Sequence, residues 1–186
     1  DTTDGDKQYT VIAENYALPD MKIIKRDAMS GKPIAGTVFS VKSVTGSFST
    51  SVTTGTDGSA TLSAIPTGVY VVREESVPEP YIVSNTEQTV ALRPGQTSEV
   101  TFVDYEKPGL EIIKKNIANG DPIEGVTYRI EQIDGSFSTT ATTDSHGRIF
   151  LDSIPVGTYK VTEINVPSHV ILCPIPQEVA LKAGET

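Results

Sequence analysis

The sequence predicts an all-β protein built from two tandem seven-stranded β-sandwiches, the second of which lacks its own last strand. Runs of five to eight residues rich in Val, Ile, Thr, Tyr and Phe are separated by Gly, Pro, Asn and Asp, a pattern typical of short strands joined by turns. No stretch carries a sustained helical period of apolar residues. Seven such runs within 89 residues indicate a two-sheet sandwich.

An internal repeat divides the chain of 186 residues. A shift of 89 residues aligns the sequence on itself without a gap. The stretch GSFST at 46–50 returns at 135–139, and IPTGVYVVREESVP at 65–78 returns as IPVGTYKVTEINVP at 154–167. Such a repeat indicates two copies of one structural unit, which we name copy one and copy two.

The repeat and the punctuation between strands set the expected domain boundaries. We expect one complete repeat over residues 20–106 and a second, incomplete repeat over residues 107–186. Residues 1–19 are predicted to be the closing strand of a preceding repeat or an N-terminal extension. Between the copies, the proline of YEKPG at 105–109 stops the strand ladder and marks a short linker.

The strands of copy one are expected to follow the apolar runs in order. A tight-turn signal, TDG at 56–58, separates the third expected strand from the fourth. It recurs in copy two as SHG at 145–147. The expected strands cover residues 20–26, 36–44, 47–54, 59–64, 69–76, 86–92 and 98–104.

Composition excludes several classes of function. The formal net charge of −9 and the sequence pI of about 4.7 argue against nucleic acid and anionic membrane surfaces as partners, because both need a basic surface. No apolar run approaches the ~18 residues of a membrane span. Cys173 is the only cysteine, so no disulfide forms within the chain. We expect no metal and no cofactor, since no metal, phosphate-loop or hydrolase motif occurs.

In three predicted strands of copy one, the row of inward-facing apolar residues ends in an ionisable side chain. Alternate residues of a strand face one side, and the apolar stripes end in Lys25 on the first strand, Glu74 on the fifth and Asp104 on the last. A lone inward lysine usually extends to water, and a buried, unreacted ion pair is another interpretation. The equivalent positions under the shift are Lys114, Glu163 and, for Asp104, Asn15.

Burial of these groups favours chemistry between them. Desolvation lowers the pKa of a lysine and raises the pKa of a carboxyl group. A neutral lysine amine is a nucleophile, and a protonated glutamate can polarise a carbonyl and carry protons. If the lysine nitrogen touches the carboxyl carbon of Asp or the carboxamide carbon of Asn, an amide can form with loss of water or ammonia. Contact of this kind corresponds to an effective molarity on the order of 10⁵ M.

The same residues resemble the Cna B-type repeats of Gram-positive surface adhesins and pilins, which have a prealbumin-like, reverse-immunoglobulin sandwich. KIIKRDAMSGKPIAGTVFSV looks like the opening strand and hairpin of that family, and VTFVDY looks like its closing strand. YVVREESVPEPY at 70–81 is similar to the pilin E-box, with Glu74 as its glutamate, followed by Pro78 and Tyr81. The resemblance covers nearly the whole chain.

The resemblance implies a self-formed isopeptide bond between Lys25 and Asp104, assisted by Glu74. In copy two, Lys114 and Glu163 match the family pattern, but PSHV replaces PEPY and a closing strand does not follow. Copy two is therefore expected to lack its own acyl partner. A cross-link of Lys114 would need Asn15 of another molecule or the absent repeat.

These observations predict a structural module and no turnover enzyme, because the isopeptide reaction consumes its own residues. We expect two stalk repeats of an extracellular, cell-wall-attached adhesin or pilus-like protein, with neighbouring repeats as partners. The alternative is a domain that binds a host matrix protein such as collagen, which predicts an exposed apolar or aromatic patch. Aromatic residues make up only 6% of the chain, and this favours the stalk.

The N-terminal segment suggests head-to-tail self-association. The shift identifies residues 7–16 as a closing strand, while copy two has the opposite defect. An open sandwich edge is a template for strand addition. We expect residues 7–16 of one molecule to fill the open edge of copy two in another; the alternative is that residues 1–19 pack along copy one.

Overall fold

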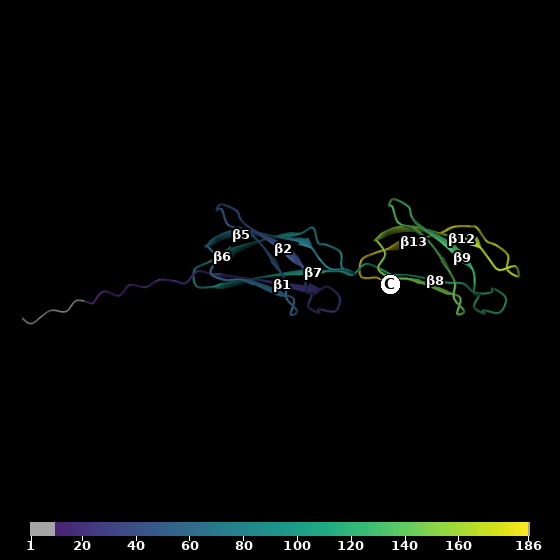
Figure 1. The fold of residues 1–186 in the computed structure, drawn as a ribbon, viewed down its shortest axis with the longest axis horizontal. Helices are drawn as coiled ribbons and strands as arrows, with labels where there is room; N and C mark the ends of the chain where they lie inside the picture. The colour runs from purple at the N-terminus through teal and green to yellow at the C-terminus, as the bar shows by residue number, and fades with distance from the viewer. Residues whose placement is uncertain (1–9, 186) are drawn as a thin grey trace, which may run out of the picture.

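A computed structural model describes residues 10–185 as two β-sandwiches joined end to end (Figure 1). No helix able to cross a membrane occurs among these residues. Copy one contains β1 (Asp20–Asp27), β2 (Val38–Ser43), β3 (Ser49–Thr53), β4 (Ser59–Leu62), β5 (Gly68–Ser76), β6 (Glu87–Leu92) and β7 (Thr97–Asp104).

The seven strands of copy one form two sheets. One sheet has the order β4-β1-β7 and the other β3-β2-β5-β6. β1 is therefore central, antiparallel to β4 and parallel to β7. The first and last strands of the copy lie side by side, so the polypeptide enters and leaves the domain through neighbouring strands. This pairing places their C-terminal ends together, with Asp27 opposite Asp104.

The core of copy one comes from the alternating residues that period two predicts. Every second residue of β1 is buried, from Met21 to Asp27, because the other face of the strand meets solvent. Phe39 and Phe102 face each other across the two sheets with ring centroids 4.8 Å apart. Tyr70 is 1% exposed and donates a hydrogen bond to the Pro66 carbonyl at 2.7 Å, which satisfies its buried hydroxyl.

Copy two repeats this sandwich without a counterpart of β7 in the described residues. Its sheets have the orders β10-β9-β12-β13 and β11-β8. One edge of β8 is therefore unpaired, on the side where β1 receives β7. The strands are β8 (Leu110–Ile113), β9 (Thr127–Gln132), β10 (Ser138–Thr142), β11 (Arg148–Leu151), β12 (Gly157–Asn165) and β13 (Gln177–Leu181).

The structure confirms the all-β fold class, and in copy one each expected strand has an observed strand with ends within two residues. The N-terminal segment differs. Residues 10–19 form no strand within this chain and run away from copy one at the end remote from copy two (Figure 1). Val11 is 89% exposed, because no neighbouring strand pairs with it here. Residues 7–9 lie outside the described residues.

Candidate cross-linking site

Lys25, Glu74 and Asp104 meet in the interior of copy one. They come from the C-terminal parts of β1, β5 and β7, and the side chains of all three have no solvent exposure or almost none. Lys25 Nζ lies 2.5 Å from Glu74 Oε2, to which it donates a hydrogen bond, and 2.5 Å from Asp104 Oδ1. The sequence prediction that these three residues face inward together is therefore correct in geometry.

A tight turn at Gly58 holds the backbone of Lys25 in place. The Lys25 backbone N–H donates to the Gly58 carbonyl at 2.7 Å. Gly58 has a φ of +71°, and a Cβ there would lie 2.5 Å from the Lys25 carbonyl oxygen, so only glycine fits. Gly147 makes the same approach to Lys114 in copy two. The turn signals in the sequence therefore mark elements that position the two lysines.

Asp104 is the least satisfied polar group of the triad. Neither of its carboxyl oxygens has a hydrogen-bond partner, although Lys25 Nζ is close, because the approach lacks hydrogen-bond alignment. A buried carboxylate without hydrogen bonds is costly. Conversion of the Lys25–Asp104 pair to a neutral amide would remove both buried charges. Lys25 Nζ and the Asp104 carboxyl group are thus in direct contact in a buried site.

The electrostatics of Glu74 suit a proton carrier. Burial raises the pKa of Glu74 from 4.5 to about 7, against the lowering effect of Lys25 and with a further rise from the Asp104 carboxyl. A carboxylic acid with a pKa near neutrality can both hold and release a proton at physiological pH. Glu74 can therefore hold or release a proton beside Asp104 at neutral pH.

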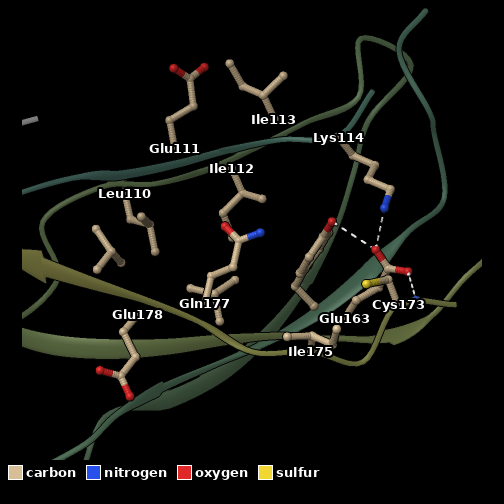
Figure 2. Close-up of a pocket in the computed structure, with 13 residues that line it drawn as sticks. Leu110, Glu111, Ile112, Ile113, Lys114, Glu163, Cys173, Ile175, Gln177 and Glu178 are labelled. Atoms are coloured by element: carbon tan, nitrogen blue, oxygen red, sulfur yellow. Dashed lines mark hydrogen bonds and ion pairs between the residues drawn. The ribbon is translucent and has the colours of Figure 1, made fainter. Parts of the chain in front are cut away.

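Copy two brings its lysine and glutamate together in a more open site (Figure 2). Lys114 Nζ donates to Glu163 Oε2 at 2.7 Å, and the Lys114 side chain is 20% exposed. Tyr128 Oη donates to the same oxygen at 3.1 Å, and the Cys173 backbone N–H donates to Oε1 at 2.9 Å. Within the part of the protein that the structure describes, Lys114 pairs with no Asp or Asn.

These hydrogen bonds give Glu163 a pKa shift opposite in direction to that of Glu74. Burial raises the pKa of Glu163, but the hydrogen bonds donated by Lys114 and by the Cys173 backbone outweigh it, and the net pKa lies below 4.5. Glu163 is thus ionised in the open site. Burial and the neighbouring Glu163 charge also raise the pKa of Tyr128, which keeps its hydroxyl protonated as a donor.

An open groove of about 310 Å³ leads into this second site (Figure 2). β8 with the residue after it forms one wall, with Ile112 and Lys114, and β13 with the segment before it forms the other, with Ile175 and Val179. The lining is mixed, with apolar residues such as Ile112 and Val179 beside Lys114 and Glu163 at one end and Glu111 and Glu178 at the other (Figure 2). The groove occupies the position that β7 fills in copy one.

Sequence reasoning missed two contributors to the site. The hydroxyl of Tyr128 stands where copy one has Phe39, so the repeat alignment already signalled a polar change at an inward position. The backbone N–H groups of Ser84 and Cys173 are equivalent under the shift and donate to Glu74 and Glu163 at 3.4 and 2.9 Å. Backbone donors leave no side-chain signature, so the sequence alone did not indicate them.

Other candidate residues lie away from the triads. Tyr81 forms an isolated β-bridge with Glu106 in the linker. The pKa of Asp27 is lowered mainly by the hydrogen bond from the Ser30 backbone, and the Tyr81 hydroxyl lowers it further. Asn15 is exposed on the N-terminal segment, which leaves copy one at the end remote from copy two (Figure 1). No group of three His, Cys, Asp or Glu side chains able to hold a metal occurs among residues 10–185.

The fold and the site define a class of protein, a prealbumin-like β-sandwich with a lysine, a glutamate and an aspartate gathered between its first and last strands. The family of SpaA prealbumin-like fold domains matches this chain twice, over residues 19–106 and 108–186. The chain belongs to that family. The match confirms the prealbumin-like fold that the resemblance implied.

Solved structures of low sequence identity share the fold. The shaft pilin SpaA of Lactobacillus rhamnosus GG, in a mutant form, is 16% identical, with a TM-score of 0.53 over 92% of this chain and 96% of that one. The Bacillus anthracis TIE protein is 23% identical, with a TM-score of 0.51 over 91% of this chain. This chain spans only 32% of the length of the TIE protein. No curated protein sequence matches it.

Proposed function

We propose that the protein is a structural stalk module of a Gram-positive surface protein, adhesin or pilus-like, whose copy one is stabilised by a Lys25–Asp104 isopeptide bond. The observation that carries the proposal is the approach of Lys25 Nζ to Asp104 Oδ1 at 2.5 Å in a buried site beside Glu74. The family match and the shaft-pilin fold support the stalk role. Neighbouring repeats are the expected partners, and the cell surface is the expected location.

The proposed reaction balances without a co-reactant. The ammonium of Lys25 and the carboxylate of Asp104 together give one amide and one water. The new bond joins Lys25 Nζ to Asp104 Cγ, and a carboxyl C–O bond breaks as water leaves. Glu74 carries the protons from the amine to the departing oxygen. The reaction occurs once per molecule, so the domain modifies itself and turns over no substrate.

The topology explains why a bond at this point would resist force. β1 and β7 are parallel neighbours, so tension applied at the two ends of the domain would shear them past each other. A bond between Lys25 and Asp104 would carry tension from one strand directly to the other. Residues 26–103 would then lie outside the path of the force and would not unravel.

The mass of the intact protein tests the bond. We expect the purified protein to be lighter than its sequence by one water, and peptide mapping to join a peptide with Lys25 to one with Asp104. Lys25→Ala and Glu74→Ala should each restore the full mass. A full sequence mass for the unmodified protein would refute the cross-link.

Lys22 supplies a matched control on the same strand. It faces solvent and pairs with Glu99 at 3.4 Å, so Lys22→Ala removes a lysine without touching the buried triad. This variant should keep the loss of one water. Retention of the bond in Glu74→Ala would show that Glu74 does not act as the proton carrier.

A further inference from the structure

The loop between β5 and β6 packs against the segment that leaves copy one. Residues 77–86 form this loop, and residues 105–107 follow β7. Tyr81 in the loop forms its isolated β-bridge with Glu106 in that segment. The loop therefore holds the polypeptide directly after Asp104. A backbone hydrogen bond flanks the bridge on each side, from the Lys107 N–H to the Pro80 carbonyl at 2.9 Å and from the Ile82 N–H to the Tyr105 carbonyl at 3.0 Å.

The side chain of Tyr81 reaches the end of β1. Its hydroxyl donates a hydrogen bond to the carboxylate of Asp27, the last residue of β1. Tyr81 is half-buried and Asp27 is buried. Burial, together with the Asp27 and Glu106 carboxylates, raises the pKa of Tyr81 to about 12, so the hydroxyl stays protonated as a donor at neutral pH. Tyr81 thus connects β1 to the segment after β7.

Asp27 is the satisfied counterpart of Asp104. The β1–β7 register places the two residues opposite each other, and both are buried. Asp27 Oδ1 accepts hydrogen bonds from the backbone of Met29 at 2.9 Å, from the backbone of Ser30 at 2.6 Å and from the Ser30 hydroxyl at 2.9 Å. Asp104 accepts no hydrogen bond. Asp27 is therefore engaged by its own turn, and Asp104 is the carboxyl group left to Lys25.

The turn after Asp27 also fixes the backbone of Asp104. The Ala28 N–H donates to the Asp104 carbonyl at 2.8 Å. On the other side, the loop with Tyr81 holds the two residues that follow Asp104. Tyr81 takes part in both arrangements, through its hydroxyl and through its backbone. Such placement matters for a reaction, because a shift of about 1 Å in a reacting group can cost about 10²-fold in rate.

We propose that Tyr81 is a positioning residue for the Lys25–Asp104 bond: its hydroxyl, through Asp27, holds Asp104 against Lys25 while the bond forms. This inference rests on the proposed cross-link and adds to it a residue outside the buried triad. Tyr81 acts through Asp27 and the backbone, and it transfers no proton in the reaction.

Copy two separates the turn from the contact with the tyrosine. Under the shift, Asn116 replaces Asp27 and Val170 replaces Tyr81. Asn116 Oδ1 accepts a hydrogen bond from the Ala118 backbone at 2.9 Å, so the same turn forms around a neutral amide. The turn therefore does not require an ionised carboxylate. In this chain, the carboxylate at that position occurs in the copy that also has the tyrosine.

Tyr81→Phe tests the proposal, because it removes the hydroxyl and keeps the ring and the backbone bridge. Tyr70→Phe is the matched control, since it removes a hydroxyl that donates to the Pro66 carbonyl at 2.7 Å near the start of β5. Each protein is collected unlinked in denaturant and then refolded, and mass spectrometry follows the loss of water. We expect Tyr81→Phe to react at least about ten-fold more slowly, and Tyr70→Phe to react at the unmodified rate.

Two further measurements distinguish positioning from other roles. The pH dependence of the rate should be the same in Tyr81→Phe as in the unmodified protein, because Glu74 sets it. Asp27→Asn, which the turn in copy two shows to be compatible with the fold, should also slow the reaction. The double variant should be no slower than Tyr81→Phe alone, because the two residues act as one unit.

Hydrogen exchange tests the contact without the bond. In a Lys25→Ala background no cross-link can form, and the Ala28 amide reports on its hydrogen bond to Asp104. Tyr81→Phe should speed the exchange of this amide at least about ten-fold relative to amides in the centre of β2. Tyr70→Phe should leave that ratio unchanged.

Each result decides the proposal. Equal rates of water loss in Tyr81→Phe and Tyr70→Phe, a changed pH dependence or additive slowing in the double variant would overturn the positioning role and leave the cross-link standing. A full sequence mass for the unmodified protein would overturn the cross-link and, with it, the role of Tyr81 in forming it. Faster exchange of the Ala28 amide would then show that the contact stabilises the fold alone.

Discussion

The two copies carry the same lysine and glutamate, yet the electrostatics of their sites are opposite. In copy one, burial beneath β7 raises the pKa of Glu74 to about 7. In copy two, where no strand among residues 10–185 covers that edge of β8, burial raises the pKa of Glu163 less than the hydrogen bonds from Lys114 and the Cys173 backbone lower it. In the proposed reaction, the closing strand supplies the acyl group. It also excludes the water that would keep the glutamate ionised.

The opposite shifts imply opposite pH dependence. An unlinked copy one loses stability as pH rises from 4.5 towards 7, because the unfolded Glu74 carboxyl releases its proton before the folded one. Glu163 stabilises copy two above its ordinary pKa of 4.5, and that contribution is lost as pH falls through the lower folded pKa. The two glutamates therefore weaken their copies in different pH ranges.

Removal of the proposed cross-link should have the largest effect on the difference in stability between the two copies. Lys25→Ala would delete the proposed bond, and by analogy with a disulfide closing a loop of this size the unfolding free energy of copy one should fall by about 4–5 kcal/mol. The cavity left by the lost side chain adds to this effect. Chemical denaturation should show copy one unfolding much earlier, with copy two unchanged.

The control for this experiment is Lys114→Ala. Lys114 has no acyl partner within the described residues, so its removal should leave the copy-one transition in place. Equal destabilisation of copy one by both substitutions would contradict a bond confined to Lys25.

The rate of bond formation should fall as pH rises above about 7. Glu74 carries protons only while it is protonated, and its raised pKa of about 7 sets the upper limit of that range. Protein refolded from a denatured, unlinked form should lose water several-fold more slowly at pH 8.5 than at pH 6. Mass spectrometry of quenched samples measures this rate.

Glu163→Gln should leave this pH profile unchanged, because it alters the other copy. A rate that increases steadily with pH would instead indicate that lysine deprotonation limits the reaction. In that case the proton held by Glu74 would have no kinetic role.

Period-two reasoning was enough to predict the triad of copy one. Strand alternation put Lys25, Glu74 and Asp104 on inward faces, and the repeat supplied an independent second reading. It could not predict the difference between the glutamates, because that difference depends on backbone donors and on solvent access. Nor could it give the path of residues 10–16, whose strand-like pattern forms no strand without a partner.

The smallest predicted effect concerns Tyr128, the residue that makes the polar network of copy two unlike that of copy one. Tyr128→Phe restores the side-chain type of Phe39 and removes the hydrogen bond to Glu163 Oε2, 3.1 Å long. Loss of a donor to an ionised carboxylate should raise the Glu163 pKa and, in this partly open site, destabilise copy two by about 1 kcal/mol.

The pH dependence of this destabilisation distinguishes loss of the hydrogen bond from simple loss of packing. The destabilisation should be present at pH 7, where Glu163 is ionised, and should disappear at a pH below the folded pKa of Glu163, where its carboxyl group is protonated. NMR titration of Glu163 measures the pKa, and denaturation at the two pH values measures the stability. A pH-independent loss would mean that the hydroxyl contributes through packing alone. The difference between the two glutamates would then rest on Lys114, the Cys173 backbone and the open strand edge.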